Sequence, residues 1–247
     1  MVIFMTSSPG GHTWDEVQQP EPLDESNDFV SNVKKYWKKD SKCITLASYP
    51  ERYEVNDMER DIMRKAFEMS GLSVSTWDVC DRRNCDKVID KLQEYDYILL
   101  SGGHVPTENA FYTEIGLKEA LKGFDGILMG ISAGTMNCAK DVYSIPELEG
   151  ESIDPAYKRY LKGLGFTDIN IIPHYQYLKN IVLDGRLMIK DIAGEDSYGR
   201  EFLVIPDGSY VLIENNMETV YGEAYIFTEG VMTQICERGK CKILRKE

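Results

Sequence analysis

Hydrophobic residues along the chain switch between two spacings, and this alternation predicts a repeated order of strands and helices. Short apolar runs of strand length occupy residues 1–6, 43–48, 74–79, 95–100, 126–131 and 169–173. Between them, apolar residues recur three or four positions apart, as on one face of a helix, in residues 29–37, 58–69, 88–92, 108–121 and 183–193. Strands that alternate with helices predict a mostly parallel, doubly wound sheet with helices on both faces.

The pattern changes in the last part of the chain. Short strands are predicted at 202–205, 209–213, 223–228, 231–235 and 242–244, joined by turn sequences such as Asp207-Gly208. They indicate a small antiparallel addition at the C-terminus. The stretch 141–165 shows no clear period and is expected to be irregular. No linker divides the sequence, so we expect residues 1–247 to form a single domain.

The segment 126–139 carries the most specific local signal. It begins as an apolar strand and changes at Ser132 to small residues with a helical pattern. A serine on such a turn has an exposed hydroxyl, and the residues two before and two after it must be nearly free of side chain, as Gly130 and Gly134 are. The pattern predicts a nucleophile elbow, with the N–H of Ala133 directed toward an anion formed beside Ser132.

The histidines point to the same edge of the sheet. All three follow predicted strands, and the ligand crevice of a parallel sheet lies outside the carboxyl ends of its strands. His174 is the only histidine downstream of Ser132, and it is the candidate general base for the serine hydroxyl. We expect His12 and His104 to line the crevice and to contact the substrate.

The base needs an acidic partner, and the oxyanion needs donors. The irregular stretch after the elbow offers five carboxylates, and spacing alone does not choose among Asp141, Glu147, Glu149, Glu151 and Asp154. For the oxyanion hole, Gly102 and Gly103 follow an apolar strand and offer unencumbered backbone N–H groups that would act with that of Ala133.

Composition limits the partners. A net charge of -13 argues against nucleic acid, because phosphate would be repelled. No apolar run approaches the roughly 18 residues of a membrane span, and the N-terminus shows no basic leader, so we expect a cytoplasmic protein without a membrane partner. The six cysteines are expected to be free thiols, with Cys236 and Cys241 facing each other across a hairpin. We expect no metal and no other cofactor.

Four blocks of the sequence together resemble the serine peptidases of the dipeptidase E and cyanophycinase group. They are Leu99-Leu100-Ser101-Gly102-Gly103, Gly130-Ile131-Ser132-Ala133-Gly134-Thr135-Met136-Asn137, Pro173-His174-Tyr175 and Ile205-Pro206-Asp207-Gly208-Ser209. Their order and spacing match from Tyr95 to Gly230. The resemblance implies a flavodoxin-like fold similar to that of the class I glutamine amidotransferases. It also implies that Ser132 is the nucleophile and His174 the base.

The resemblance further implies roles for residues that spacing leaves open. The acid of dipeptidase E corresponds in position to Glu147 here, with Glu149 as the fallback. Of the segment that dipeptidase E uses for aspartyl recognition, this chain keeps only Arg186, which is expected to contact the substrate. We therefore expect that an N-terminal aspartate is not preferred and that neutral or basic residues are accepted at least as well. The acidic residues expected at the crevice are Asp15, Glu16 and Glu108.

These observations predict an enzyme that hydrolyses dipeptides or short peptides through a Ser-His-Glu triad and an acyl-enzyme. Two alternatives remain. One is an α/β-hydrolase esterase, which shares the elbow and the order serine, acid, histidine, although its histidine follows further parallel strands. The other is a non-catalytic, ligand-binding relative of the amidotransferase-like fold. The residue preference at the scissile bond stays open, as does the oligomeric state, for which a homodimer is one option.

Overall fold

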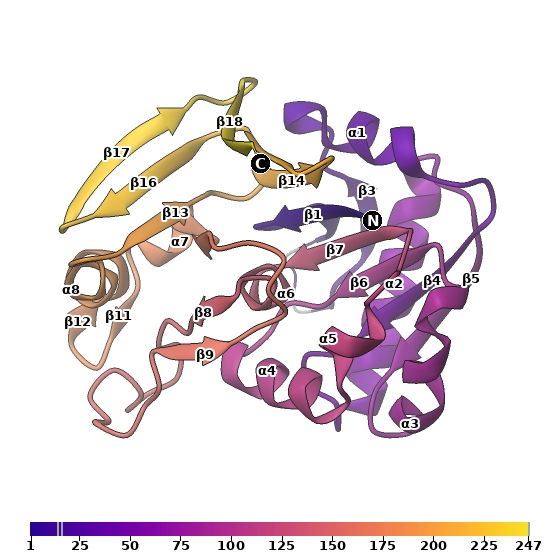
Figure 1. The fold of residues 1–247 in the computed structure, drawn as a ribbon, viewed down its shortest axis with the longest axis horizontal. Coiled ribbons are helices and arrows are strands. Elements are labelled where there is room, and N and C mark those ends of the chain that lie inside the picture. The colour runs from indigo at the N-terminus through magenta and orange to yellow at the C-terminus, as the bar shows by residue number, and fades with distance from the viewer. Residues whose placement is uncertain (14, 16, 247) are drawn as a thin grey trace.

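One large mixed sheet organises the chain (Figure 1). The computed structural model describes residues 1–13, 15 and 17–246. The strands of the large sheet are Val2–Thr6 (β1), Ser41–Leu46 (β4), Val74–Cys80 (β5), Tyr97–Leu100 (β6), Ile127–Ile131 (β7), Tyr210–Glu214 (β14), Met217–Tyr221 (β15) and Cys241–Lys246 (β18). Their order is β18-β15-β14-β1-β7-β6-β4-β5. From β1 to β5 neighbouring strands run parallel, whereas β14, β15 and β18 pair antiparallel.

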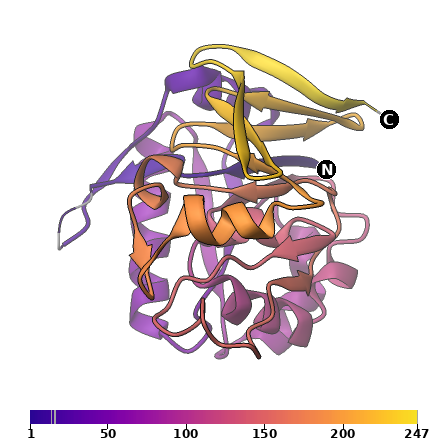
Figure 2. The same ribbon diagram turned by 90° about the vertical axis from the view of Figure 1, so that its left-hand side faces the viewer.

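A second sheet lies beside the first. Its strands, in spatial order, are Asn170–Ile172 (β10), Glu201–Val204 (β13), Ala224–Thr228 (β16) and Val231–Cys236 (β17). In Figure 2, the orange and yellow C-terminal strands form a layer over the rest of the chain. Three two-stranded ribbons complete the strands: Gly10–His12 (β2) with Pro20–Leu23 (β3), Asp141–Tyr143 (β8) with Tyr160–Lys162 (β9), and Val182–Leu183 (β11) with Arg186–Leu187 (β12).

Helices lie on both faces of the large sheet and against the second sheet. They are Phe29–Tyr36 (α1), Tyr53–Met69 (α2), Cys85–Val88 (α3), Val105–Glu114 (α4), Leu117–Ala120 (α5), Ala133–Asn137 (α6), Tyr175–Leu178 (α7) and Gly194–Asp196 (α8). The chain also forms the 3-10 helices Ser26–Asp28 and Ile89–Glu94 and the π-helix Met188–Ala193. Among the described residues, no helix is both long and apolar enough to cross a membrane.

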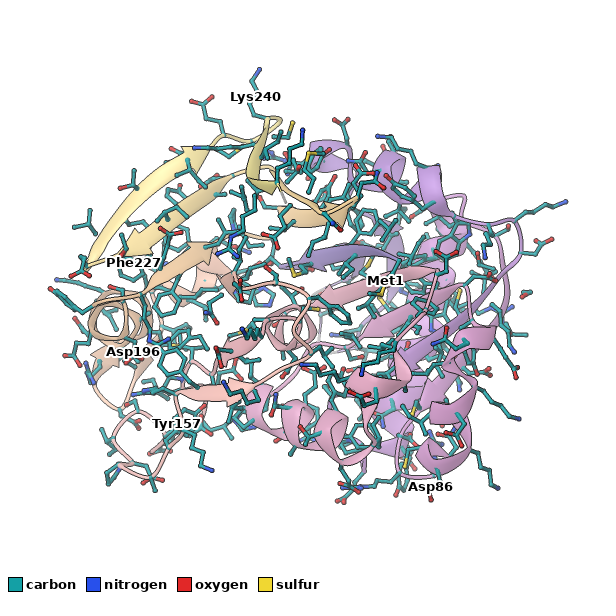
Figure 3. All side chains as sticks on the ribbon, viewed as in Figure 1. Met1, Asp86, Tyr157, Asp196, Phe227 and Lys240 are labelled. Carbon is teal, nitrogen blue, oxygen red and sulfur yellow. The ribbon has the colours of Figure 1, made fainter. Side chains whose placement is uncertain are left out.

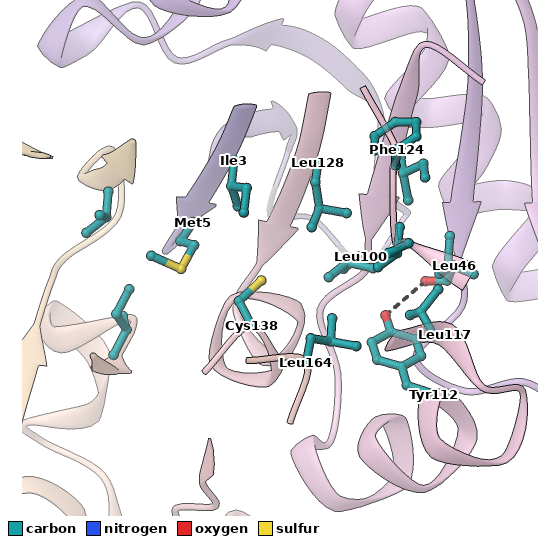
Figure 4. Packing of buried hydrophobic residues seen from close by; sticks show 14 of the residues in the cluster. Ile3, Met5, Leu46, Leu100, Tyr112, Leu117, Phe124, Leu128, Cys138 and Leu164 are labelled. Carbon is teal, nitrogen blue, oxygen red and sulfur yellow. Dashed lines mark hydrogen bonds between the residues drawn. The ribbon is translucent and has the colours of Figure 1, made fainter. Parts of the chain in front are cut away.

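The two faces of the sheet build separate hydrophobic clusters, because neighbouring side chains of a strand point to opposite faces. Phe4 of β1 packs with Val33 of α1 and Phe67 of α2. Its neighbours Ile3 and Met5 belong to the opposite cluster, together with residues of α4 and α5. Figure 4 shows this second cluster, with Tyr112 and Leu117 from those helices. Burial on both faces explains why the central strands read as unbroken apolar runs.

The predicted fold class is confirmed, and several local predictions need correction. The stretch 141–165 contains the ribbon β8–β9, and the predicted helix at 183–193 is instead part of the ribbon β11–β12 followed by a π-helix. Strand β15 was not predicted. Cys236 and Cys241 are free but do not face each other, because β17 and β18 pair within different sheets. Lys240 extends from the turn between them (Figure 3).

The turn after β7 depends on two very close backbone contacts. A Cβ at Gly130 would lie 2.6 Å from the backbone N of Thr135, and a Cβ at Gly134 would lie 2.3 Å from the carbonyl O of Leu100 in β6. Real side chains do not tolerate such distances, so helix α6 can fold back against β7 and β6 only with glycine at both positions.

Gly134→Ala should therefore destabilise the protein. The added methyl group would have to move the Leu100 backbone, which we expect to lower the free energy of unfolding by about 2–4 kcal/mol. The control is Gly194→Ala, because Gly194 has a helical φ of -59 and its Cβ would meet its nearest neighbour at 3.5 Å. Urea unfolding should show a lower midpoint for Gly134→Ala alone, and equal midpoints would contradict the packing argument.

Candidate active site

Ser132 lies on the strained turn between β7 and α6, as the sequence predicts. Its backbone has φ 51 and ψ -112, a conformation that residues with side chains rarely adopt. Two hydrogen bonds hold the turn against the neighbouring strands: the Ser132 N–H donates to the Thr6 carbonyl at 3.1 Å, and the Gly134 N–H donates to the Ser101 carbonyl at 3.1 Å. The turn is thereby fixed to the ends of both β1 and β6.

His174 is held by a carboxylate, and that carboxylate belongs to Asp207. The His174 Nδ1 lies 2.7 Å from Asp207 Oδ1. Ser7, at the end of β1, donates its hydroxyl to the same Asp207 oxygen at 2.6 Å and accepts the His174 backbone N–H at 2.8 Å. His174 itself has a left-handed backbone, with φ 56 and ψ 33, directly before α7. The ring is thus fixed through Nδ1, which leaves Nε2 as its possible proton acceptor.

The environment of Asp207 favours its charged form. Burial alone would raise the pKa of this carboxyl, but the hydrogen bonds and charge of His174, with the hydrogen bond from Ser7, outweigh burial and hold the pKa below its ordinary value. An ionised carboxylate in this position can fix the imidazole tautomer and stabilise an imidazolium.

The structure does not pair His174 with the expected Glu147 or Glu149. Glu149 is exposed on the loop after β8. Burial, and then the charge of Glu151, raise the pKa of Glu147 to about 8, so that this carboxyl is largely neutral near pH 7. A neutral carboxylic acid cannot stabilise an imidazolium by charge. The expectation of a Ser-His-Glu arrangement is therefore corrected to Ser132, His174 and Asp207.

Three backbone N–H groups around Ser132 are available for a ligand. In the part of the chain that the structure describes, those of Gly102, Gly103 and Ala133 donate no hydrogen bond. Gly102 lies directly beside Ser132, since a Cβ added to it would be 3.2 Å from Ser132 Cβ. The Ser48 hydroxyl donates to the Gly102 carbonyl at 2.7 Å. The Gly102 C=O and the Gly103 N–H belong to one trans peptide bond and point in opposite directions. The hydrogen bond from Ser48 therefore directs the Gly103 N–H away from Ser48.

Ser132 and His174 line a common pocket of about 270 Å³. No hydrogen bond joins their side chains within residues 1–13, 15 and 17–246, a separation common in ligand-free sites, where such bonds tighten only around substrate. The remaining lining comes from the strand ends, from the β2–β3 region and from one face of α2. These residues are Ser8, His12, Gln18, Glu59, Ile62, Met63, Leu99, Ser101, Gly102, Gly103 and Ile131.

Of the expected substrate contacts, only His12 lines this pocket. His104 turns away, with Nε2 2.9 Å from Glu151 Oε1 and Nδ1 2.8 Å from Thr107 Oγ1. Arg186 forms an ion pair with Glu195 at 2.6 Å. Both expectations of substrate contact therefore need correction, because each side chain is already held by a partner outside the pocket.

The expected acidic groups at the crevice also differ from the structure. Glu108 is fully buried, where it accepts a hydrogen bond from Asn137 and pairs with the Tyr112 hydroxyl. Burial raises its pKa to about 8, so that it is neither charged near pH 7 nor accessible. Asp15 is exposed and does not line the pocket. Glu16 lies outside the described residues.

Sequence reasoning missed three residues of this site. Asp207 was assigned to a turn, although it belongs to a block that carries the family resemblance, and Ser7 was assigned to a loop after the first strand. Glu59 had a detectable signal: it precedes Ile62 and Met63 by three and four positions, so it interrupts the apolar face of α2 with a carboxylate.

The fold is the class I glutamine amidotransferase-like, flavodoxin-like arrangement that the sequence predicts. Within that class, the chain belongs to peptidase family S51, whose family model matches residues 53–220. The matched range contains Ser132, His174 and Asp207. The chain is therefore a peptidase by family, which favours the amidotransferase-like fold over the alternative of an α/β-hydrolase esterase.

A solved structure supports the fold. A crystal structure at 1.5 Å of a candidate peptidase E protein from Listeria monocytogenes EGD-e is similar with a TM-score of 0.55 and 17% sequence identity. The similarity covers 99% of this chain and 98% of the other. No curated protein matches the sequence.

Proposed function

We propose that this protein is a serine peptidase that hydrolyses dipeptides or other short peptides through an acyl-enzyme. The observation that carries the proposal is the placement of Ser132 on a strained turn in the same pocket as a histidine whose Nδ1 is held by an ionised aspartate. This combination provides a nucleophile, a base and an orienting acid.

In the first half-reaction, Ser132 Oγ attacks the scissile carbonyl while His174 Nε2 takes the hydroxyl proton. The carbonyl oxygen becomes an oxyanion, and the N–H groups of Gly102, Gly103 and Ala133 are suited to hold it. As the C–N bond breaks, the imidazolium returns its proton to the leaving amine, and the acyl group remains on Ser132. Asp207 stays ionised and stabilises the imidazolium by charge.

In the second half-reaction, water replaces the amine. His174 takes a proton from the water as its oxygen attacks the ester, and then returns this proton to Ser132 Oγ when the acid is released. A pocket of about 270 Å³ is small and favours short peptides. Among the described residues, no lysine or arginine lines the pocket. The side-chain carboxylate of an N-terminal aspartate would therefore be buried there without a cation, which is energetically costly. This supports the expectation that such substrates are not preferred.

Ser132→Ala should abolish peptide hydrolysis and leave the fold intact. Loss of the nucleophile should lower kcat by at least about 1,000-fold, and labelling by an uncharged fluorophosphonate probe should disappear. Ser75→Ala, at an exposed position of β5, is the matched control and should keep both. Wild-type rates in the folded Ser132→Ala variant, or labelling of another serine, would refute the proposed mechanism.

Asp207→Asn should damage catalysis far more than Glu147→Gln. An amide at 207 can present its NH2 group to the ring and favour the wrong tautomer, so we expect kcat to fall by about 100- to 10,000-fold. Glu147→Gln replaces a largely neutral carboxyl and should change kcat by less than about threefold. The comparison uses steady-state kinetics with one short peptide. If Glu147→Gln has the larger effect, the acid is Glu147 and Asp207 has a structural role.

A further inference from the structure

A single carboxylate faces the pocket from helix α2. Glu59 precedes Ile62 by three residues and Met63 by four, so the three side chains share one helix face, and all three line the pocket. Met63 and the neighbouring Ala66 pack closely on β2, since a Cβ at Gly11 would lie 3.2 Å from Ala66 Cβ and 3.4 Å from Met63 Sδ. This packing fixes the helix face, and Glu59 with it, toward the pocket.

The carboxylate of Glu59 is not paired with a cation in the described part of the chain. It forms no ion pair within 4.0 Å there, and the charge that acts on it most is that of Arg52. The Arg52 guanidinium instead stacks on the Tyr49 ring, 4.1 Å from its centroid. Partial burial raises the pKa of Glu59 to about 7, because a carboxylate that loses contact with water without gaining a partner is destabilised relative to its neutral acid.

The charge distribution of the pocket singles out this residue. Glu59 is the only carboxylate among the described residues that line the pocket, and no lysine or arginine lines it. A carboxylate held in such a partly apolar site is costly unless a cation pairs with it. A bound ligand that brings a positive charge would supply that partner, whereas a ligand with a carboxylate would meet repulsion.

We propose that Glu59 is the specificity-determining residue that receives a cationic group of the peptide substrate. The inference rests on the proposed function, because it assigns a substrate class to the same pocket. The shared chemistry is a positively charged nitrogen bound by a carboxylate, and it has two sources in a peptide: the α-ammonium group of a free N-terminus, or the side chain of lysine or arginine.

Three chromogenic substrates separate these sources: leucine p-nitroanilide carries only an α-ammonium, N-acetyl-arginine p-nitroanilide only a side-chain cation, and N-acetyl-leucine p-nitroanilide neither. Glu59→Gln should lower kcat/KM for at least one cationic substrate by about 10- to 100-fold, mostly through KM, because a charged pair becomes a neutral contact. For the uncharged substrate the change should stay below about threefold. The cationic substrate that loses most identifies the source.

The matched control is Glu54→Gln, which removes the same charge from an exposed position on the same helix. It should leave all three kcat/KM values within about twofold of wild type. Equal effects of Glu59→Gln on all three substrates, or no effect on any, would overturn the inference.

A second measurement separates this inference from the proposed function. In the Ser132→Ala background, calorimetry can compare binding of leucinamide, argininamide and their N-acetyl forms with and without Glu59→Gln. If wild-type protein is not labelled by fluorophosphonate, the proposed function fails, and calorimetry still decides about Glu59. Cation-dependent binding that Glu59→Gln weakens by about tenfold or more supports the inference. Binding that does not depend on Glu59 contradicts it.

Discussion

The hydrogen bond between His174 and Asp207 links the ends of two paired strands and, through Ser7, the end of a strand in the large sheet. His174 follows β10 and Asp207 follows β13, two parallel neighbours in the second sheet. Ser7 follows β1 in the large sheet and bonds to both residues. Three strand ends from two sheets are thus connected by one carboxylate and one hydroxyl. The position of the imidazole relative to Ser132 depends on this set, because no other contact holds the ring nitrogen Nδ1 so closely.

The turn between β7 and α6 positions Ser132, as the bond to Asp207 positions His174. The backbone strain of this turn is offset by the packing around it. A residue with a side chain in the conformation of Ser132 costs on the order of 1–3 kcal/mol. The cost is tolerated because β7 lies at the centre of the sheet, buried on both faces, and because Gly130 and Gly134 allow α6 to pack against it. Strain at Ser132 and burial of the neighbouring strand are therefore parts of the same arrangement.

Local patterns predicted much of the fold. The parallel strands, the helix α2 and the elbow at Ser132 follow from apolar spacing and from two glycines, all of which act over a few residues. The carboxylate that bonds to His174 could not be found in this way. Glu147 was inferred from family position, but Glu151 occupies this loop: it accepts the N–H of Glu147 at 2.9 Å and binds His104. Asp207 reaches the histidine only because β10 and β13 pair, a contact between distant segments that spacing along the chain does not encode.

Arg186 and Glu108 fail as ligand contacts for a related reason. Each is a residue type that peptide sites use, yet the fold pairs Arg186 with Glu195 and buries Glu108 beside Asn137 and Tyr112. A charged residue indicates a ligand-binding site only when its side chain faces a pocket and is not paired with another side chain. Glu59 meets that condition, and its signal was the break that it makes in the apolar face of α2.

The proposed mechanism requires that His174 carries its proton on Nδ1, toward Asp207, so that Nε2 can accept the proton of Ser132. Nitrogen-15 NMR of protein labelled in its three histidines tests this directly, because the chemical shift of each ring nitrogen shows whether it carries a proton. Spectra of the His174→Gln variant would assign the signals. We expect a protonated Nδ1 and an unprotonated Nε2 for His174, with the Nδ1 proton shifted downfield by the short bond to Asp207. A neutral ring protonated on Nε2 would contradict the proposed base and the role of Asp207 together.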